Sequence, residues 1–400
     1  AQLDALAADS AGSLYFTECV NAGTFRAQCT LVAVTDTGRQ LWATAFSHVT
    51  STGNGALRDQ LVIAGENVVS AIGPSWLDAF DRSTGARRWS VDLSAPGVLP
   101  GLTLTSVRFV AVGFDGQSSL AVAVEASQHG ALAGSRLLRI DSRSGAVVRQ
   151  VPLPAQGFSL VLDRSANLFL AHGAGGPTYD DALTAFDPAW NVLWQRTTPL
   201  IGSHIRTLHA THRSQLLSQH PAQTEWVSTA AGASTSTSLP VSRVAWPAVW
   251  SDAAQFLVQQ HCLMPTCASF YDYQVDLLAI DNSTLLARRA VLPRLSGWGG
   301  PWLTQRQSAL LAVRGWGGAT ELFEIDARAD TLMRCPLEWG PRRTIQAGPV
   351  LSQGRWAVVT GDDSDGYNPS VDVWELPGYA PSTSGWVSPR GGPGLDLRAR

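Results

Sequence analysis

The chain has 400 residues with a formal net charge of −3, and it contains 37 glycines, 22 prolines and 15 tryptophans. This balance shows no clustered basic face and argues against a nucleic-acid partner, and no apolar run reaches the roughly 18 to 20 residues that span a bilayer. All 29 basic side chains are arginine, which excludes enzymes that need a lysine, namely Schiff-base enzymes, P-loop nucleotide binders and Ser-Lys hydrolases.

A repeated pattern runs along the chain, in which an aspartate is followed by a glycine and then by a tryptophan. Its clearest copies are LVAVTDTGRQLW at residues 31–42, LDAFDRSTGARRW at 77–89 and LTAFDPAWNVLW at 183–194. Self-similarity at a fixed period is the signature of a repeat architecture. The residues at the aspartate position are Asp36, Asp81, Asp141, Asp187, Asp281, Asp326 and, with glutamate substituting, Glu375.

The spacing of these residues gives the number of units. Most gaps are 45 to 60 residues, but the gap from Asp187 to Asp281 is 94 residues. A gap of two periods predicts a degenerate copy, which we place at residues 225–238. The sequence therefore predicts eight units, with bounds near 1–46, 47–95, 96–153, 154–200, 201–240, 241–293, 294–340 and 341–388, and a C-terminal tail at 389–400.

Each unit opens with a short polar turn followed by an apolar run, as in DSAGSLYFT at 9–17 and DRSANLFLA at 163–171. Polar turns between short β-branched and aromatic runs are hairpin signals, and no long segment has apolar residues at helical spacing. We therefore predict an all-β fold, a single-domain eight-bladed β-propeller over residues 1–388. Its four-stranded antiparallel blades are expected to protect their edges by radial packing and ring closure.

The pattern AFDxxTGxxxW, best kept as AFDRSTGARRW at residues 79–89, resembles the repeat of the quinoprotein (PQQ) dehydrogenase-like propellers. In that family the tryptophan of one blade docks against the neighbouring blade, which implies docking roles for Trp42, Trp89, Trp194 and Trp386. Arginine occupies the equivalent place in three further units, and its stem can be buried there while the guanidinium stacks. These arginines are Arg149, Arg289 and Arg334.

The best-known activity of the family is alcohol or sugar oxidation with PQQ and a calcium ion. Many of those enzymes carry an adjacent Cys-Cys pair against the quinone and extra segments around it, whereas this chain has neither adjacent cysteines nor the additional length. Because the cofactor supplies the hard chemistry in such enzymes, we expect no resident PQQ. A PQQ-dependent dehydrogenase is the least favoured interpretation.

Two pairs of cysteines flank hairpin loops, Cys19 with Cys29 and Cys262 with Cys267. Each pair can close a local disulfide, with reduced thiols as the alternative. Local disulfides indicate an oxidising location, so we expect a bacterial protein that is secreted, periplasmic or associated with the outer membrane. No signal peptide is visible, as in an exported chain whose mature form begins at Ala1.

The loop GDDSDGYNPS at residues 361–370 contains three side chains with oxygen ligands suited to Ca²⁺, those of Asp363, Asp365 and Asn368. An EF-type calcium loop needs more ligands and a distal glutamate, so the alternative of a solvated hairpin turn is favoured and we expect no cofactor. No HExxH, CxxCH or GxSxG motif occurs, and we predict no catalytic residue.

The long connections between second and third strands are predicted to emerge on one face of the propeller. Because loops carry binding function more often than the scaffold beneath them, we predict a non-catalytic, extracytoplasmic scaffold that presents this face to a protein partner in the cell envelope or at the cell surface. In size it is similar to the propeller lipoprotein that assists outer-membrane protein assembly. The alternative is a carbohydrate-binding or carbohydrate-active propeller, with exposed Trp298, Trp302 and Trp316 stacking on sugars; against this, the same rings can fill gaps between blades.

Overall fold

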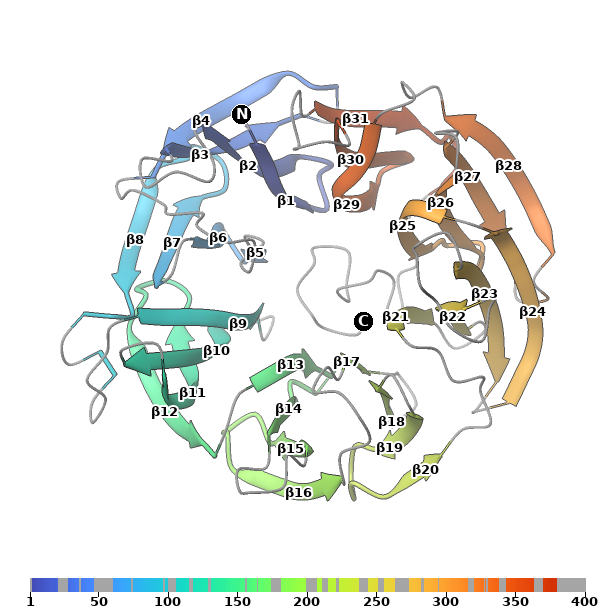
Figure 1. Ribbon diagram of the computed structural model, residues 1–400. Coiled ribbons are helices and arrows are strands. Elements are labelled where there is room, and N and C mark those ends of the chain that lie inside the picture. Colours follow the sequence, from blue (N-terminus) through green and yellow to red (C-terminus); the bar gives the residue numbers. More distant parts are fainter. Residues whose placement is uncertain are drawn as a thin grey trace. The chain divides into compact units, whose positions relative to one another are not determined.

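The computed structural model is all-β, since every helix or strand among the residues it describes is a strand (Figure 1). The described residues are 2–379 without the segments 21–27, 36, 47–59, 73–74, 96–97, 100–105, 115–117, 129–130, 155–156, 164, 174–180, 199–206, 211–214, 221–222, 237–243, 251–254, 263–272, 282–283, 294, 316–319, 327, 329, 338–342 and 363–369. Side chains are not described between residues 235 and 301. In the part of the chain described, no helix has the length and hydropathy of a membrane span.

The first compact unit is built on Ala1–Leu200 and holds four sheets of four strands each. The first sheet contains β1 (Gln2–Ala8), β2 (Leu14–Val20), β3 (Gln28–Val34) and β4 (Gln40–Ala45). The second contains β5 (Gln60–Ala64), β6 (Asn67–Ile72), β7 (Trp76–Asp81) and β8 (Arg87–Asp92). The third and fourth contain β9 (Ser106–Phe114), β10 (Ser119–Gln128), β11 (Ala131–Asp141), β12 (Val147–Leu153), β13 (Gly157–Leu162), β14 (Leu168–Gly173), β15 (Asp181–Phe186) and β16 (Val192–Thr198).

The second compact unit is built on Ile201–Pro393. Its first two sheets contain β17 (Thr207–Ala210), β18 (Gln215–His220), β19 (Gln223–Ser228), β20 (Ser234–Ser236), β21 (Val244–Trp250), β22 (Gln255–Cys262), β23 (Tyr273–Asp281) and β24 (Thr284–Pro293). Its last two contain β25 (Leu295–Leu303), β26 (Ala309–Gly315), β27 (Thr320–Ile325), β28 (Thr331–Leu337), β29 (Arg343–Ser352), β30 (Arg355–Asp362) and β31 (Ser370–Glu375).

Every sheet is a meander, in which each strand pairs antiparallel with the strand that follows it. Within each unit, consecutive sheets contact through their first strands, β1 with β5, β5 with β9 and β9 with β13 in the first unit, and β17 with β21, β21 with β25 and β25 with β29 in the second. Short four-stranded meanders that pack on one another in series are the construction principle of β-propeller blades.

The aspartate of the repeat begins the turn between the third and fourth strands of a sheet. In the second sheet the Oδ1 atom of Asp81 accepts hydrogen bonds from the amides of Ser83 and Thr84, at 3.0 and 2.8 Å. The amide of Asp81 donates to the carbonyl of Ala86, and the amide of Gly85 to the carbonyl of Asp81, both at 2.8 Å. Gly85 has φ +72°, a left-handed conformation that glycine adopts without steric cost.

The same backbone pattern identifies the degenerate fifth copy. The amide of Ser228 donates to the carbonyl of Ala233 at 2.8 Å, and the amide of Gly232 donates to the carbonyl of Ser228 at 2.9 Å. Gly232 also has a positive φ of 66°. Serine therefore stands at the aspartate position, inside the segment 225–238 in which the copy is predicted.

A shorter form of this turn closes the fourth and first sheets. In the fourth, Asp187 accepts a backbone hydrogen bond from Trp190, which has a φ of 66°. In the first, the amide of Thr35 donates to the carbonyl of Arg39 at 2.8 Å, and the Thr35 hydroxyl accepts from the amide of Arg39 at 3.1 Å. The predicted anchor Asp36 is therefore wrong by one residue, because a threonine hydroxyl serves here as the turn-forming acceptor; Asp36 itself lies outside the described residues.

The glycine of the repeat is covered by the tryptophan of the preceding sheet. A Cβ atom on Gly85 would lie 2.5 Å from Cδ2 of Trp42, and one on Gly145 would lie 2.7 Å from Cε3 of Trp89. The Nε1 atom of Trp42 donates to the carbonyl of Arg82 at 3.1 Å, and Trp89 makes the equivalent bond to the third sheet at 3.0 Å. Aspartate, glycine and tryptophan recur together in these sheets because the indoles of Trp42 and Trp89 pack on the glycine that the next sheet provides.

Arginine replaces this tryptophan in two different ways. The Nη1 atom of Arg149 donates to the carbonyl of Ala189 at 2.5 Å, so this side chain reaches the turn of the following sheet as the indoles do. Arg334 instead makes two hydrogen bonds, of 2.9 and 2.8 Å, to the carboxylate of Glu321 in its own sheet. The side chain of Arg289 lies outside the described residues.

Apolar side chains fill the remaining space between sheets. One buried cluster joins the second and third sheets through Val69, Leu77, Leu120, Val122 and Ile140. Another joins the third and fourth through Leu137, Leu160, Leu168, Leu170 and Phe186. Each such side chain stabilises the fold by about 1.5–3 kcal/mol when fully buried, so these clusters contribute substantially to holding neighbouring sheets together.

Candidate binding surface at the loop end

Each sheet has two ends of different character. The turn end carries the connections between first and second and between third and fourth strands, and these turns are described in most sheets. The loop end carries the connections between second and third strands and the passage to the next sheet. The long loops predicted to form a recognition surface are 18–30, 127–136, 172–181, 261–274 and 362–370. In all of them except 127–136, most residues lie outside the described part of the chain.

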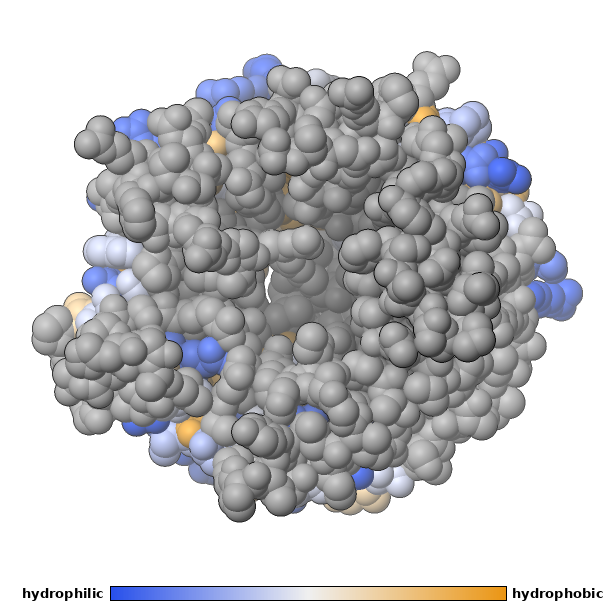
Figure 2. All heavy atoms as spheres, in the orientation of Figure 1, coloured by the Kyte–Doolittle hydropathy of each residue, from blue (hydrophilic) through white to orange (hydrophobic). Residues whose placement is uncertain are grey.

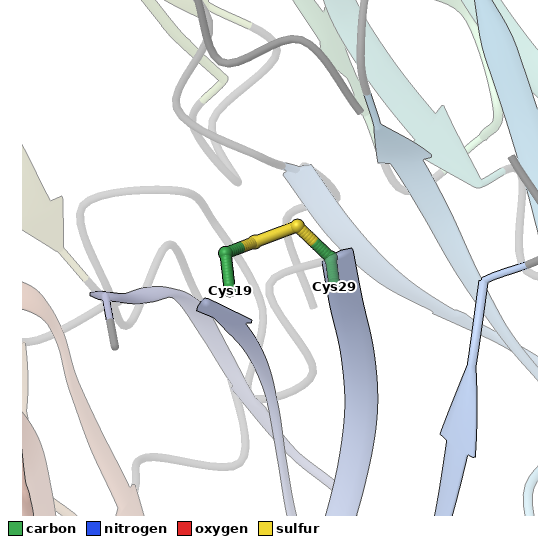
Figure 3. Close-up of a disulfide and its surroundings, with 2 residues drawn as sticks. All are labelled: Cys19 and Cys29. Carbon is green, nitrogen blue, oxygen red and sulfur yellow. A yellow bond between two sulfur atoms is a disulfide. The ribbon is translucent and has the colours of Figure 1, made fainter. Parts of the chain in front are cut away.

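A disulfide marks the loop end of the first sheet. Cys19 and Cys29 are directly paired across β2 and β3, with their Cα atoms 4.1 Å apart and their sulfurs bonded (Figure 3). Both residues are buried, at 0% and 2% exposure. The bridge fixes the base of the connection between these strands. Of the second predicted pair, Cys262 is the last residue of β22 and Cys267 lies outside the described residues, so that bridge stays a prediction.

A carboxylate orders the loop end of the second sheet. The Oδ1 atom of Asp92 accepts hydrogen bonds from the hydroxyl of Ser75 at 2.7 Å and from the amide and hydroxyl of Ser94 at 2.9 and 2.7 Å. The amide of Leu93 donates to the carbonyl of Ser75 at 2.9 Å. These bonds hold the chain as it leaves β8, which gives the loop end a fixed base.

His172 lies at the loop end of the fourth sheet and is 1% exposed. Its Nδ1 atom is 2.7 Å from the carbonyl of Gly173, and its Nε2 atom is 2.8 Å from the hydroxyl of Thr184. Burial lowers the pKa of His172 below its usual value, against opposing effects of the Gly173 carbonyl and the Asp181 carboxylate. The neutral imidazole is hydrogen-bonded through both nitrogens and has a structural role. The sequence does not reveal this role, because Thr184 is twelve residues away on the adjacent strand.

The acidic side chains of the turn end accept hydrogen bonds from backbone amides and from neighbouring side chains. Hydrogen bonds from Ser83, and then from Arg88, hold the pKa of Asp81 well below its usual range. Hydrogen bonds from the hydroxyl and amide of Ser144 lower the pKa of Asp141 in the same way. These carboxylates close turns and so are poorly placed to act as general acids or bases.

The predicted calcium ligands Asp363, Asp365 and Asn368 lie outside the described residues. Among the residues that are described, no three His, Cys, Asp or Glu side chains are grouped so as to hold a metal ion. The chain also lacks the adjacent cysteines that the quinoprotein resemblance implies.

The predicted aromatic positions lie in different surroundings. Trp302, near the end of β25, is fully buried, so its expected exposure for sugar stacking is wrong; the alternation of side chains along a strand turns this ring toward the core. Trp298 is described by its backbone only, and Trp316 and Trp386 lie outside the described residues. The ring of Trp194 is half-buried, with its centroid 6.1 Å from that of a phenylalanine in its own sheet.

The described surface is mainly polar. Figure 2 shows that the coloured residues on this face are mostly hydrophilic, with isolated hydrophobic ones. The exposed large hydrophobic residues are on fourth strands: Leu41, Val148, Val192, Leu193 and Leu332. A few scattered exposed apolar side chains are normal on the surface of a folded protein.

Comparison with known proteins gives a likeness in fold. No family model and no curated protein sequence matches the chain. Among solved structures it is similar to BamB from Moraxella catarrhalis, with a TM-score of 0.56 and 16% identity over 92% of this chain and 95% of that chain. It is also similar to the quinohemoprotein alcohol dehydrogenase from Comamonas testosteroni (TM-score 0.58, 11% identity, 95% of this chain and 75% of that chain) and to a europium-containing methanol dehydrogenase (0.53, 13%, 90% and 83%). The chain therefore has the PQQ-like β-propeller fold, as its repeat predicts.

Proposed function

We propose that the chain is a non-catalytic, extracytoplasmic binding scaffold, in which eight blades form one propeller domain over residues 1–388 and the loop end binds a protein partner of the cell envelope. The observation that carries this proposal is the share of each chain that is matched in the structural comparison. This chain and BamB match along 92% and 95% of their lengths, whereas the chain matches 75% of the quinohemoprotein alcohol dehydrogenase. The match thus takes in almost all of the former chain and leaves a quarter of the latter unmatched.

The side chains support a scaffold in preference to an enzyme. Carboxylates of the turn end close turns, the buried histidine of the fourth sheet is hydrogen-bonded on both nitrogens, and the sequence lacks lysine and adjacent cysteines. Fold alone does not determine function, so the proposal depends on these residues as well as on the comparison. We propose that neither PQQ nor a metal ion is resident.

The disulfide supports the proposed location. A fully buried Cys19–Cys29 bridge forms and persists in oxidising compartments, which favours the periplasm, the outer membrane or the cell exterior. The partner is then a protein of the envelope or the cell surface. A glycan ligand is the weaker candidate, because Trp302, the one tryptophan of the predicted stacking set whose side chain is described, is buried.

Site-specific photo-crosslinking tests this proposal. A photoreactive residue replaces Glu18 or Thr197, which are exposed at the loop end of the first and fourth sheets. In the control variants it replaces Thr84 or Ser165, which are exposed at the turn end of the second and fourth sheets. The full chain is then irradiated in cell-envelope preparations. We expect the same discrete protein adduct from the two loop-end positions and none from the turn-end positions, which serve as matched controls. Adducts from the turn end alone, or no adduct from either end, would contradict the proposed binding surface.

A further inference from the structure

His172 is buried at the place where the fourth sheet leads into one of its long loops. It is the second-last residue of β14, and it pairs with Ala182 of β15, while Gly173 pairs with Asp181. These are the last two pairs of the ladder before residues 174–180, which lie outside the described part of the chain. His172 thus belongs to the part of the ladder that holds the loop end of this sheet.

The two hydrogen bonds of the ring are both satisfied by neutral imidazole. A carbonyl oxygen only accepts hydrogen bonds, so the Nδ1 atom, 2.7 Å from the carbonyl of Gly173, carries the hydrogen. The Nε2 atom then has a lone pair and accepts from the hydroxyl of Thr184 at 2.8 Å. A second proton on Nε2 would turn this acceptor into a donor, and the Thr184 hydroxyl would have to give up its present bond.

Burial opposes a positive charge on this ring. Loss of solvation lowers the pKa of His172 and outweighs the Gly173 carbonyl and the Asp181 carboxylate, which act in the opposite direction. Within the sheet, β13 has no titratable residue and Asp181 is the one acidic residue of β15. A buried charge is costly unless it is paired. Protonation of His172 is therefore easier when the ladder around it opens.

The third sheet adds one carboxylate to the surface that packs on the fourth sheet. Side chains two residues apart on a strand share a face, and Ala123 and Leu170 both belong to the buried cluster between these sheets. Glu125 and His172 follow them by two residues and therefore lie on the facing surfaces. Glu125 is directly opposite Arg108 of β9, and opposite charges in such a pair attract each other. Glu125 thus has a cation beside it before any charge forms on His172.

We propose that His172 makes the loop end of the fourth sheet sensitive to acid, because protonation of the ring opens the last two pairs of the β14–β15 ladder and so weakens partner binding. The effect on binding rests on the proposed function, whereas the opening does not. Thr197, an exposed residue of the loop end, links the two parts. It pairs with Ala182, which pairs with His172, so a change at His172 reaches the strand that presents Thr197.

Residue-resolved hydrogen exchange on the full chain tests the opening. Rates at each pH are divided by the intrinsic rate of the unfolded chain. Among the amides of residues 172, 173, 181 and 182, those protected at pH 7.5 should lose protection as pH falls below about 6.5. The loss can reach about tenfold per pH unit, the limit for one bound proton. The amides of Leu168 and Phe186, which pair at the turn end of the same ladder, should keep their protection.

Two variants assign the response to a residue. His172→Gln keeps a polar side chain that does not titrate and should remove the loss of protection in acid. His209→Gln replaces a histidine of β17 in another sheet; it is the matched control and should leave the loss unchanged. Equal protection of the wild type at pH 7.5 and pH 5.5 would overturn the proposal, and this result does not require a variant to fold. A loss that persists in His172→Gln would overturn it as well.

Photo-crosslinking from position 197 at the two pH values tests the effect on binding. We expect a lower adduct yield at pH 5.5 than at pH 7.5 in the wild-type background and equal yields in the His172→Gln background, which controls for titration of the partner. Equal yields in the wild-type background would contradict the effect of acid on binding alone. No adduct at either pH would contradict the proposed function and with it this effect, while hydrogen exchange decides on the opening by itself.

Discussion

Replacing Gly85 with alanine tests whether the glycine of the repeat is required to receive the tryptophan of the preceding sheet. Two costs add at this position. Gly85 has φ +72°, and an L-residue in the left-handed region costs about 1–2 kcal/mol. The new methyl group would also lie 2.5, 2.6 and 2.9 Å from three ring atoms of Trp42.

The collision sets the larger part of the expected effect. Carbon atoms pack at about 3.5–4.0 Å, so the Trp42 ring must move by roughly 1 Å. Overpacking of this kind costs about 1–3 kcal/mol, and loss of the hydrogen bond from Trp42 to the carbonyl of Arg82 costs about 1 kcal/mol more. We therefore expect Gly85→Ala to lower the free energy of unfolding by about 3–6 kcal/mol.

The matched control is Gly65→Ala in the same sheet. Gly65 has a similar φ of +62°, but no atom lies within 4 Å of the place of its Cβ, so we expect only the conformational cost of about 1–2 kcal/mol. Urea unfolding followed by circular dichroism measures both variants. In a Trp42→Ala background, Gly85→Ala should cost no more than Gly65→Ala. If Gly85→Ala and Gly65→Ala are equally destabilising in the wild-type background, the tryptophan–glycine docking argument is refuted.

Three further predictions concern single groups. Asp81→Asn should destabilise the chain by about 1–3 kcal/mol at pH 7, because hydrogen bonds to a charged group are lost; since the folded-state pKa of Asp81 is depressed, the difference from wild type should shrink as pH falls below about 4 in urea titrations. His172 also has a folded-state pKa below its usual value, so its contribution to the free energy of unfolding is present above about pH 6.5 and is lost as pH falls toward the folded-state pKa. His172→Gln should therefore flatten the dependence of stability on pH below about 6.5. An unchanged slope in the variant would count against the buried neutral imidazole. Replacing both Cys19 and Cys29 with serine should cost about 2–3 kcal/mol for a loop of this length, and equal unfolding midpoints of variant and wild type would show that the bridge adds nothing.

The repeat in the sequence predicts the sheets because its residues have one local task each. Asp81 caps a turn with its carboxylate, Gly85 takes a positive φ, and Trp42 covers that glycine from the preceding sheet, so spacing alone reveals the unit. Where another residue performs the same task, the pattern fails while the structure persists. Thr35 replaces the expected Asp36 in this way. Ser228 begins a turn that lacks the motif, and the sequence indicates it only by the gap of two periods between Asp187 and Asp281.

The candidate binding surface is less predictable from sequence. The Cys19–Cys29 pair is predictable because both residues flank one hairpin loop, but the bond between His172 and Thr184 depends on strand register, which no local pattern encodes. The burial of Trp302 shows the same limit, since neighbouring glycines in the sequence do not determine which face of β25 a ring takes. Long loops carry no repeated pattern, so their partner cannot be read from them.

The claim that this propeller serves binding without catalysis is tested most directly by loading the full chain with PQQ and Ca²⁺. Thermal unfolding is measured with and without both, with EDTA as the control, and alcohol- or sugar-dependent reduction of an electron-accepting dye is measured on the same samples. A ligand that binds only the folded state stabilises it by about 2.7 kcal/mol at a hundredfold excess over its dissociation constant. The account predicts no shift in the unfolding midpoint and no dye reduction. A saturable, EDTA-sensitive shift accompanied by substrate-dependent dye reduction would contradict it and make the protein an oxidoreductase.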